Sequence, residues 1–299
     1  MAKTPTNIFL DINIKYADIF GKAFELFESV FEYVGIEFGS QKSSATAENI
    51  KFISRSSDDR ILMSMTFAES NNYKLLCSSN ISLMFKLNEL VFLFAKISSK
   101  FPVRIYCMED SKSALIFVYT NLAGKVEETE LHAMNTTVFA TTPKTMNFEM
   151  VVVRMSTFHS TCNEIAIESK KVKIKSLGDD IFFVYPARGK PGSGYTGASV
   201  YTDEFKKEKT NKINGDELVR TYKPMEVVAG IFSIDELLKY TDIMSHFIEN
   251  ELSKYNAMSS HYMNHDANIY LVENDSLYFN CSNLDPNNQY DLTMRIPKI

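Results

Sequence analysis

The sequence predicts an α+β fold made of two similar domains, each built from two strand–helix–three-strand units. Three observations favour this fold. The chain has 299 residues, which suits two domains of about 150 residues each. Four amphipathic helical patterns begin near residues 17, 86, 156 and 234, at nearly regular intervals. Each follows an apolar strand-like run and precedes alternating runs separated by turn residues, as in antiparallel hairpins.

The four helical patterns place apolar side chains three and four residues apart, with polar side chains between them. The clearest start is that of the fourth helix. There Ser233 and Glu236 form a capping box, and Phe232 and Leu237 occupy the two staple positions around it. The predicted helices span residues 17–34, 86–100, 156–169 and 233–254.

The predicted strands fall into the same four units. The strands before the helices are residues 7–14, 73–85, 148–155 and 226–232. The strands after the helices are residues 35–38, 49–54, 103–108, 114–120, 172–175, 181–185, 268–272, 277–281 and 290–296. Pairing the units would give two domains with helices on one face of antiparallel sheets. We therefore expect an N-terminal domain over 1–130, a connecting linker over 131–147 and a C-terminal domain over 148–299.

The composition excludes several classes of protein. A hydrophobic content of 45% and a charged content of 23% argue against a disordered, collagen-like or coiled-coil chain. The four cysteines include no C-x-x-C pair, so neither a zinc site nor a disulfide framework is indicated. No apolar run suits a signal peptide or a membrane span of about 20 residues. We expect an intracellular protein that is not secreted.

Several stretches resemble sliding clamps of the proliferating cell nuclear antigen family. They are residues 85–90 (FKLNEL), 103–110 (VRIYCMED), 150–158 (MVVVRMSTF), 177–184 (LGDDIFFV) and 294–299 (MRIPKI). Their order and spacing follow the family through most of the chain, and the divergence suggests a viral member. The resemblance implies a DNA-clamp fold with antiparallel sheets outside and four helices lining the inside. It also implies a homotrimeric ring that encircles duplex DNA without reading its sequence and tethers a DNA polymerase and other replication or repair proteins.

The resemblance further implies where such a clamp would touch its ligands. Cations on or beside the helices would face DNA: Lys15, Lys22, Lys86, Lys96, Lys100, Lys170, Lys171 and Lys239. Partner motifs would dock at the linker and the end of the sequence, on Leu131, Met134, Val138, Phe139, Ile296, Pro297 and Ile299. Subunits would pair through edge strands that contain Tyr73, Leu75, Cys77, Val200 and Tyr201. The clamp would work in the nucleus or at a cytoplasmic viral replication site.

Charge is the point at which the sequence departs from this expectation. The formal net charge is −5, so any attraction to DNA depends on local clusters of cations. Helix lysines are few, and basic residues concentrate instead in an insert over 186–223. An alternative is therefore a clamp-fold viral processivity factor that binds DNA as a monomer or dimer through a basic face. A second insert covers residues 245–266.

Two other patterns are weaker. Residues 192–197 match G-x-G-x-x-G, but prolines precede the match and a β-rich run follows, so we expect a flexible loop and not a dinucleotide site. His261 and His265 are spaced like metal ligands, but their polar neighbours favour a solvated loop. We expect no metal, no cofactor, no catalytic residues and no enzymatic activity. A nucleotide-dependent enzyme and a structural viral assembly protein remain as competing hypotheses.

Overall fold

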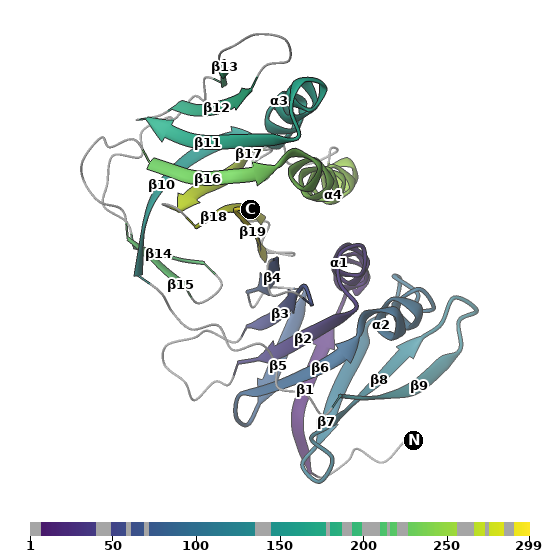
Figure 1. Ribbon diagram of the computed structural model, residues 1–299. Coiled ribbons are helices and arrows are strands. Elements are labelled where there is room, and N and C mark those ends of the chain that lie inside the picture. The colour runs from purple at the N-terminus through teal and green to yellow at the C-terminus, as the bar shows by residue number, and fades with distance from the viewer. Residues whose placement is uncertain are drawn as a thin grey trace. The chain divides into compact units, whose positions relative to one another are not determined.

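The structure is a computed structural model of the chain (Figure 1). It describes residues 7–39, 49–57, 61–68, 72–134, 145–177, 180–186, 193–198, 210–213, 216–219, 227–255, 266–272, 275–283 and 290–299. The fold is α+β, as predicted, with four described helices and predominantly antiparallel sheets.

The chain divides into two compact units. Unit 1 comprises Met1–Ser56, Ser64–Ala140 and Asn283–Asp291. Unit 2 comprises Ser57–Met63, Thr141–Ser282 and Leu292–Ile299. Within the segment predicted to be a linker, Leu131 and His132 belong to strand β9, and 145–147 belong to strand β10.

In unit 1 two helices accompany two sheets. One sheet has the strand order β5-β1-β7-β8-β9, and the other runs β4-β3-β2-β6. The elements are β1 (Ile8–Ile14), α1 (Asp18–Glu28), β2 (Tyr33–Phe38), β3 (Ile50–Arg55), β4 (Leu62–Phe67), β5 (Tyr73–Cys77), β6 (Ile81–Lys86), α2 (Leu87–Phe94), β7 (Val103–Met108), β8 (Ala114–Thr120) and β9 (Val126–His132).

Unit 2 repeats this plan with one addition. One sheet has the order β13-β12-β11-β16, and the other runs β14-β15-β10-β17-β18-β19, where β14 and β15 are an extra hairpin. The elements are β10 (Thr145–Arg154), α3 (Met155–Glu168), β11 (Lys171–Leu177), β12 (Asp180–Pro186), β13 (Ser193–Ala198), β14 (Thr210–Ile213), β15 (Asp216–Val219), β16 (Val227–Ser233), α4 (Ile234–Tyr255), β17 (Asp266–Val272), β18 (Ser276–Asn283) and β19 (Tyr290–Pro297).

The strand–helix–three-strand order occurs four times, and the halves of each unit exchange their first strands. The first strand of one half, β1, pairs with β7 of the other half, and β6 pairs with β2. In unit 2, β10 pairs with β17 and β16 pairs with β11 in the same way. A single half therefore leaves its first strand, and one side of the strand after its helix, without a partner, because those partners belong to the other half. Two halves are needed to complete one folded unit.

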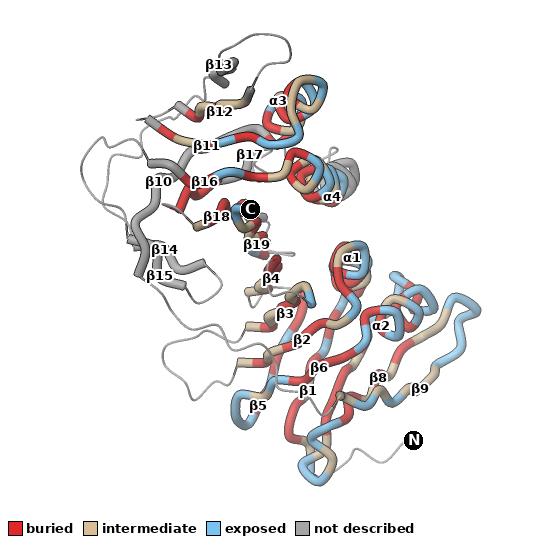
Figure 2. The backbone as a smooth tube through the Cα atoms, in the orientation of Figure 1, coloured by how far each residue is buried: buried red, intermediate tan, exposed pale blue. Residues whose placement is uncertain are grey.

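The first helix of each unit, α1 or α3, packs across both sheets of its unit. In unit 1, Phe20 of α1 stacks on Phe67 of β4, with ring centroids 4.6 Å apart, and meets Tyr73 of β5 edge-on at 6.1 Å. In unit 2, Phe158 of α3 contacts Phe183 of β12 and Phe279 of β18. The helices thus cover one face of the sheets, and in each unit the two helices lie side by side (Figure 1). The buried positions cluster where helices and sheets meet (Figure 2).

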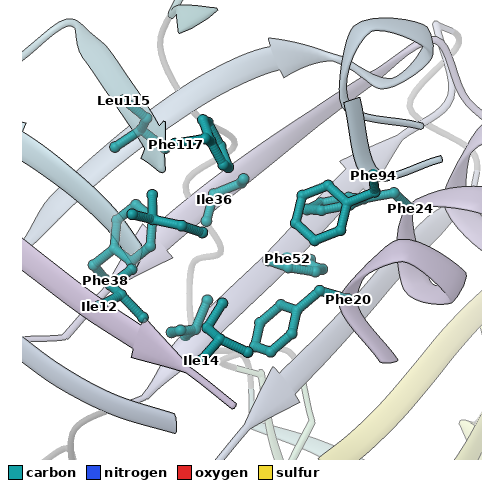
Figure 3. Close-up of a pocket in the computed structure, with 12 residues that line it drawn as sticks. Ile12, Ile14, Phe20, Phe24, Ile36, Phe38, Phe52, Phe94, Leu115 and Phe117 are labelled. Carbon is teal, nitrogen blue, oxygen red and sulfur yellow. The ribbon is translucent and has the colours of Figure 1, made fainter. Parts of the chain in front are cut away.

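A small cavity in the core of unit 1 is entirely apolar. Its volume is about 20 Å³, and its lining includes Ile12, Phe24, Ile36 and Phe117 (Figure 3). A buried water needs two to four polar partners, and this lining offers none. The cavity is a packing defect of the core and not a ligand site.

Four predictions of local structure were wrong. The first helix ends at Glu28, because the following β-branched and aromatic residues pair as β2. The second helix ends at Phe94. Residues 73–85 are two strands in different sheets and not one strand. Residues 193–198 form β13, antiparallel to β12, so the glycine-rich match is neither a flexible loop nor the strand–helix turn of a dinucleotide site.

Candidate interaction surfaces

The four described helices are strongly acidic. Within their bounds they contain 11 Asp or Glu and only 3 Lys or Arg. The acidic residues are exposed or half-buried wherever their side chains are described, as at Asp18, Glu25 and Asp242. A duplex carries two phosphates for every 3.4 Å of its axis, so a surface with this excess of carboxylates repels it.

Only two of the lysines expected to face DNA lie within a helix. Lys22 is half-buried on α1, and Lys239 is exposed on α4 with its Nζ 5.3 Å from the Tyr240 ring centroid. Lys86 is the N-cap residue of α2. The other five lie outside helix bounds, and all are exposed: Lys15, Lys96, Lys100, Lys170 and Lys171.

Lys170 and Lys171 are adjacent in the sequence, but their side chains lie in different surroundings. Lys170 forms an exposed ion pair with Asp235, at 3.1 Å between Nζ and Oδ1, which neutralises it beside the start of α4. Lys171 begins β11, where strand alternation places it with Lys173 and Lys175, while Val172 and Ile174 are buried. Lys171 therefore faces away from the core that α3 covers.

An exposed apolar surface with a cation lies at the end of α2, and we call it the α2 surface. It consists of Phe92, Lys96 and Leu122. The side chains of Phe92 and Leu122 are 65% and 74% exposed. Lys96 Nζ lies 3.9 Å from the Phe92 ring centroid, and the Leu122 backbone N–H donates to the Lys96 carbonyl at 3.1 Å. The three residues therefore form one continuous surface.

The β8–β9 turn holds Leu122 in place. The Asn121 side-chain oxygen accepts hydrogen bonds from the backbone N–H groups of Ala123 and Lys125, at 3.0 and 2.9 Å. The Asn121 amide donates to Glu127 at 2.7 Å. Gly124 completes the turn with a positive φ of 81°, a conformation that glycine adopts without strain. Such a turn presents its apolar side chain at little entropic cost on binding.

A second exposed apolar residue has acidic surroundings, on what we call the α3 surface. Ile167 is 69% exposed on α3, and Glu164 is exposed one turn before it on the same stripe. The α3 surface, Glu164 and Ile167, thus combines an apolar side chain with a carboxylate. It is opposite in charge to the α2 surface. Sequence analysis missed both surfaces, although Phe92 and Ile167 fall at positions where their helical patterns are otherwise polar.

The strand expected to pair subunits lies at a sheet edge. As described, the five-stranded sheet of unit 1 ends in β5 and β9. On β5 the side chains of Tyr73, Leu75 and Cys77 are buried, while Lys74 and Leu76 are exposed. Val200 and Tyr201 lie outside the described residues, and β13, which ends two residues before Val200, is the edge strand of its sheet.

The residues expected to dock partner motifs fall in separate units. In unit 1, Leu131 is half-buried in β9, and the Met134 N–H donates to the Met84 carbonyl at 2.8 Å. In unit 2, Ile296 is buried in β19 and Pro297 is half-buried at its end. Val138 and Phe139 lie outside the described residues.

Lys298 and Ile299 lie against β16. Ile299 is exposed, and its N–H donates to the Ile231 carbonyl at 2.8 Å. Gly230 has a φ of 141°, and the space a side chain would take there is filled by Lys298. This end of the sequence therefore has a defined position in which Ile231 and Ile299 remain exposed together.

The described residues offer no metal cluster of three or more His, Cys, Asp or Glu side chains. No described helix is long and apolar enough to cross a membrane. Burial raises the pKa of the Cys162 thiol to about 12, and burial with the nearby Cys77 raises that of Cys107 to about 11. Such thiols are poor nucleophiles at neutral pH. His261 and His265 lie outside the described residues, as does most of the basic insert 186–223.

No family model matches the chain, and no curated protein matches it with significant similarity.

Proposed function

We propose that this chain is a DNA sliding clamp: a ring-forming homotrimer that encloses duplex DNA and tethers a polymerase to it. The repeated fold supports the proposal, since two equivalent units with helices on one face suit the subunit that the resemblance implies. The observation that carries it is the complementarity of the α2 and α3 surfaces. One combines exposed apolar side chains with Lys96, and the other combines Ile167 with Glu164.

Two different, complementary surfaces on one chain favour head-to-tail assembly. A head-to-tail contact closes into a ring when the rotation between subunits allows it. Burying Phe92 and Leu122 of one copy against Ile167 of the next would remove exposed apolar area from water, and Lys96 would face Glu164. The edge strands β5 and β13 offer backbone groups that would extend the same contact.

The acidic helices limit how such a ring would hold DNA. With 11 acidic and 3 basic residues, the helices supply little attraction for phosphate. On its helix side the proposed clamp therefore retains DNA by enclosure and not by affinity. Partner motifs would dock near Met134 and Pro297, and a peptide of the form Gln-x-x-apolar-x-x-aromatic-aromatic should perturb both neighbourhoods.

Light scattering tests the assembly directly. The proposal expects a mass of about three times the 34.1 kDa of the chain. A monomer at every salt and protein concentration would contradict it.

Two variants and their mixture test the head-to-tail contact. Leu122→Asp should block the α2 surface by facing Glu164, and Ile167→Lys should block the α3 surface by facing Lys96. Each variant alone should be monomeric, because every contact needs both surfaces. An equal mixture should form dimers and no trimers, because one functional α2 surface can meet one functional α3 surface.

Val126→Asp is the matched control for this experiment. Val126 is 66% exposed and begins β9, outside both surfaces. This control should remain trimeric. Trimeric Leu122→Asp, or a mixture that stays monomeric, would show that these surfaces do not join subunits.

A further inference from the structure

The strongest cluster of described cations lies on the outer face of β11. Lys171, Lys173 and Lys175 alternate with Val172, Ile174 and Ser176, which are buried. The buried side faces α3, since Phe183 of the neighbouring strand contacts Phe158 of that helix with ring centroids 5.4 Å apart. The three lysines therefore share the opposite face of the sheet, which we call the β11 face.

Among the described residues, the strand register places no acidic side chain beside Lys171 or Lys173 on the strands that flank β11. The register places Lys173 between Val184 of β12 and Ile231 of β16, and Lys171 opposite Ser233. Lys175 lies beside Phe182, with its Nζ 5.8 Å from the ring centroid. In a chain with a net charge of −5 and acidic helices, the β11 face is a local concentration of positive charge.

The spacing of the lysines fits a phosphate backbone. Alternate residues of a strand are about 6.6 Å apart. Phosphates of one DNA strand advance 3.4 Å per step along the axis and also turn about it, so the distance between neighbouring phosphates is larger than this rise and is close to the spacing of the lysines. A flat row of cations suits such a regular polyanion, whereas a peptide partner depends on pockets for its side chains.

We propose that the β11 face binds the phosphate backbone of duplex DNA through Lys171, Lys173 and Lys175. This contact is separate from the helix surface that a clamp would turn toward enclosed DNA, and it does not require the ring. Although the protein is acidic overall, its affinity for DNA would come from this face of the sheet. The contact is independent of sequence, because phosphate contacts position DNA without reading its bases.

The salt dependence of binding measures this contact. A fluorescein-labelled duplex of about 20 base pairs is titrated with protein at several salt concentrations, and binding is followed by anisotropy. Each phosphate contact contributes about 0.9 to the slope of log K against log salt. The triple variant Lys171→Gln, Lys173→Gln, Lys175→Gln should lower the magnitude of that slope by about 2.7 and weaken binding. The corresponding Lys→Arg triple variant should retain the slope, which separates lost charge from damaged folding.

The matched control neutralises the helix side at positions outside the α2 surface: Lys22→Gln, Lys100→Gln, Lys239→Gln. It removes the same charge and should leave the slope unchanged. An unchanged slope in the β11 variant, a loss confined to the helix-side variant, or no duplex binding by the wild-type chain would overturn the proposal. So would a β11 variant that loses binding to polyglutamate, used as the acidic peptide probe, but not to the duplex. Light scattering on the same samples reports ring formation separately, so the two proposals fail independently.

Discussion

Unit 1 and unit 2 exchange equivalent strands between their halves but close their helix pairs with different chemistry. In unit 1, Phe24 of α1 meets Phe94 of α2 with ring centroids 5.1 Å apart, and Gly21 lies against Phe94. In unit 2, His159 of α3 and Thr241 of α4 are hydrogen-bonded at 3.0 Å. In both units the strands that are exchanged occupy equivalent positions: β1 and β6 in unit 1, and β10 and β16 in unit 2. The strand exchange therefore defines the topology of each unit, whereas the residues that join its two helices differ between the units.

The cores of the two units also differ in their aromatic contacts, which are more numerous in unit 1 among the described residues. Phe52 of unit 1 has four phenylalanine rings within 6.3 Å between centroids. The rings that meet Phe158 in unit 2 are those of Phe183 and Phe279. Among the described residues, unit 1 thus concentrates its packing energy in one aromatic cluster, while unit 2 combines a smaller cluster with a polar helix contact.

The largest expected effect comes from opening the aromatic cluster. Phe52→Ala should lower the free energy of unfolding by about 3–5 kcal/mol, since it leaves a cavity and removes several ring contacts. Phe183→Ala, equally buried in unit 2, should cost less. Urea unfolding followed by circular dichroism gives the loss, and hydrogen exchange should place it in the mutated unit. Equal losses would remove the distinction between the two cores.

Alkaline pH should separate the buried thiols of the two units. The thiols of Cys162 and Cys107 stay protonated to about pH 12 and 11, whereas the unfolded chain loses these protons from about pH 9. The folded state then binds more protons, so stability falls as pH rises through this window, by up to ~1.4 kcal/mol per pH unit for a single thiol.

The variants Cys162→Ala and Cys107→Ala should each flatten this decline, and the effect of Cys162→Ala should extend to higher pH. Urea titrations from pH 6 to 12 provide the measurement. Between pH 6 and 8 the wild-type chain and both variants should share the same slope. A parallel decline above pH 9 would mean that the thiols titrate normally.

Alanine substitutions at two glycines with positive φ compare the stability cost of backbone strain with and without a steric clash. Gly230→Ala should cost about 2–3 kcal/mol, because its Cβ would lie 2.8 Å from Lys298 Cβ at a φ of 141°. Gly124→Ala, in the β8–β9 turn of unit 1, should cost about 1 kcal/mol, since nothing lies within 4 Å of the added atom. Thermal melts compare the two, and equal costs would show that the Lys298 contact yields without penalty.

The smallest effect concerns the polar helix contact of unit 2. The Thr241 hydroxyl donates to the Leu237 carbonyl at 2.7 Å, so His159 Nδ1–H is the donor to Thr241. Thr241→Val should lower stability by about 1–2 kcal/mol, and Thr241→Ser should restore most of it. Urea unfolding is the measurement. If valine is neutral, this contact contributes no more than an apolar one.

The predictions that succeeded rest on local patterns. The Ser233 oxygen accepts a hydrogen bond from the Glu236 backbone N–H at 3.4 Å, and Phe232 and Leu237 are buried, as the capping box and staple predict. The β7 and β8 strands have their predicted bounds. The third and fourth helices agree within one residue at each end. Each of these signals lies within a few residues, where sequence spacing and spatial neighbourhood coincide.

The predictions that failed depend on partners distant in the sequence. Strand β9 was not predicted, because its three glutamates leave little apolar alternation, and its pairing with β8 is what makes it a strand. Residues 73–85 carry a continuous strand pattern, but β5 joins β1 while β6 joins β2. The candidate surfaces show the same limit, because Leu122 and Phe92 become neighbours only through the contact of Leu122 with Lys96.

The sequence by itself determined the fold class, the four repeats and the small number of helix cations, because periodicity, caps and charge are local properties. The tertiary structure decided which strands exchange between halves and where the cations lie. The two adjacent lysines show why: Lys170 is neutralised by Asp235, whereas strand alternation turns Lys171 to the outer face of the sheet. The sequence states which residues are charged. The face of the protein on which each charged side chain lies depends on pairing between segments far apart in the chain.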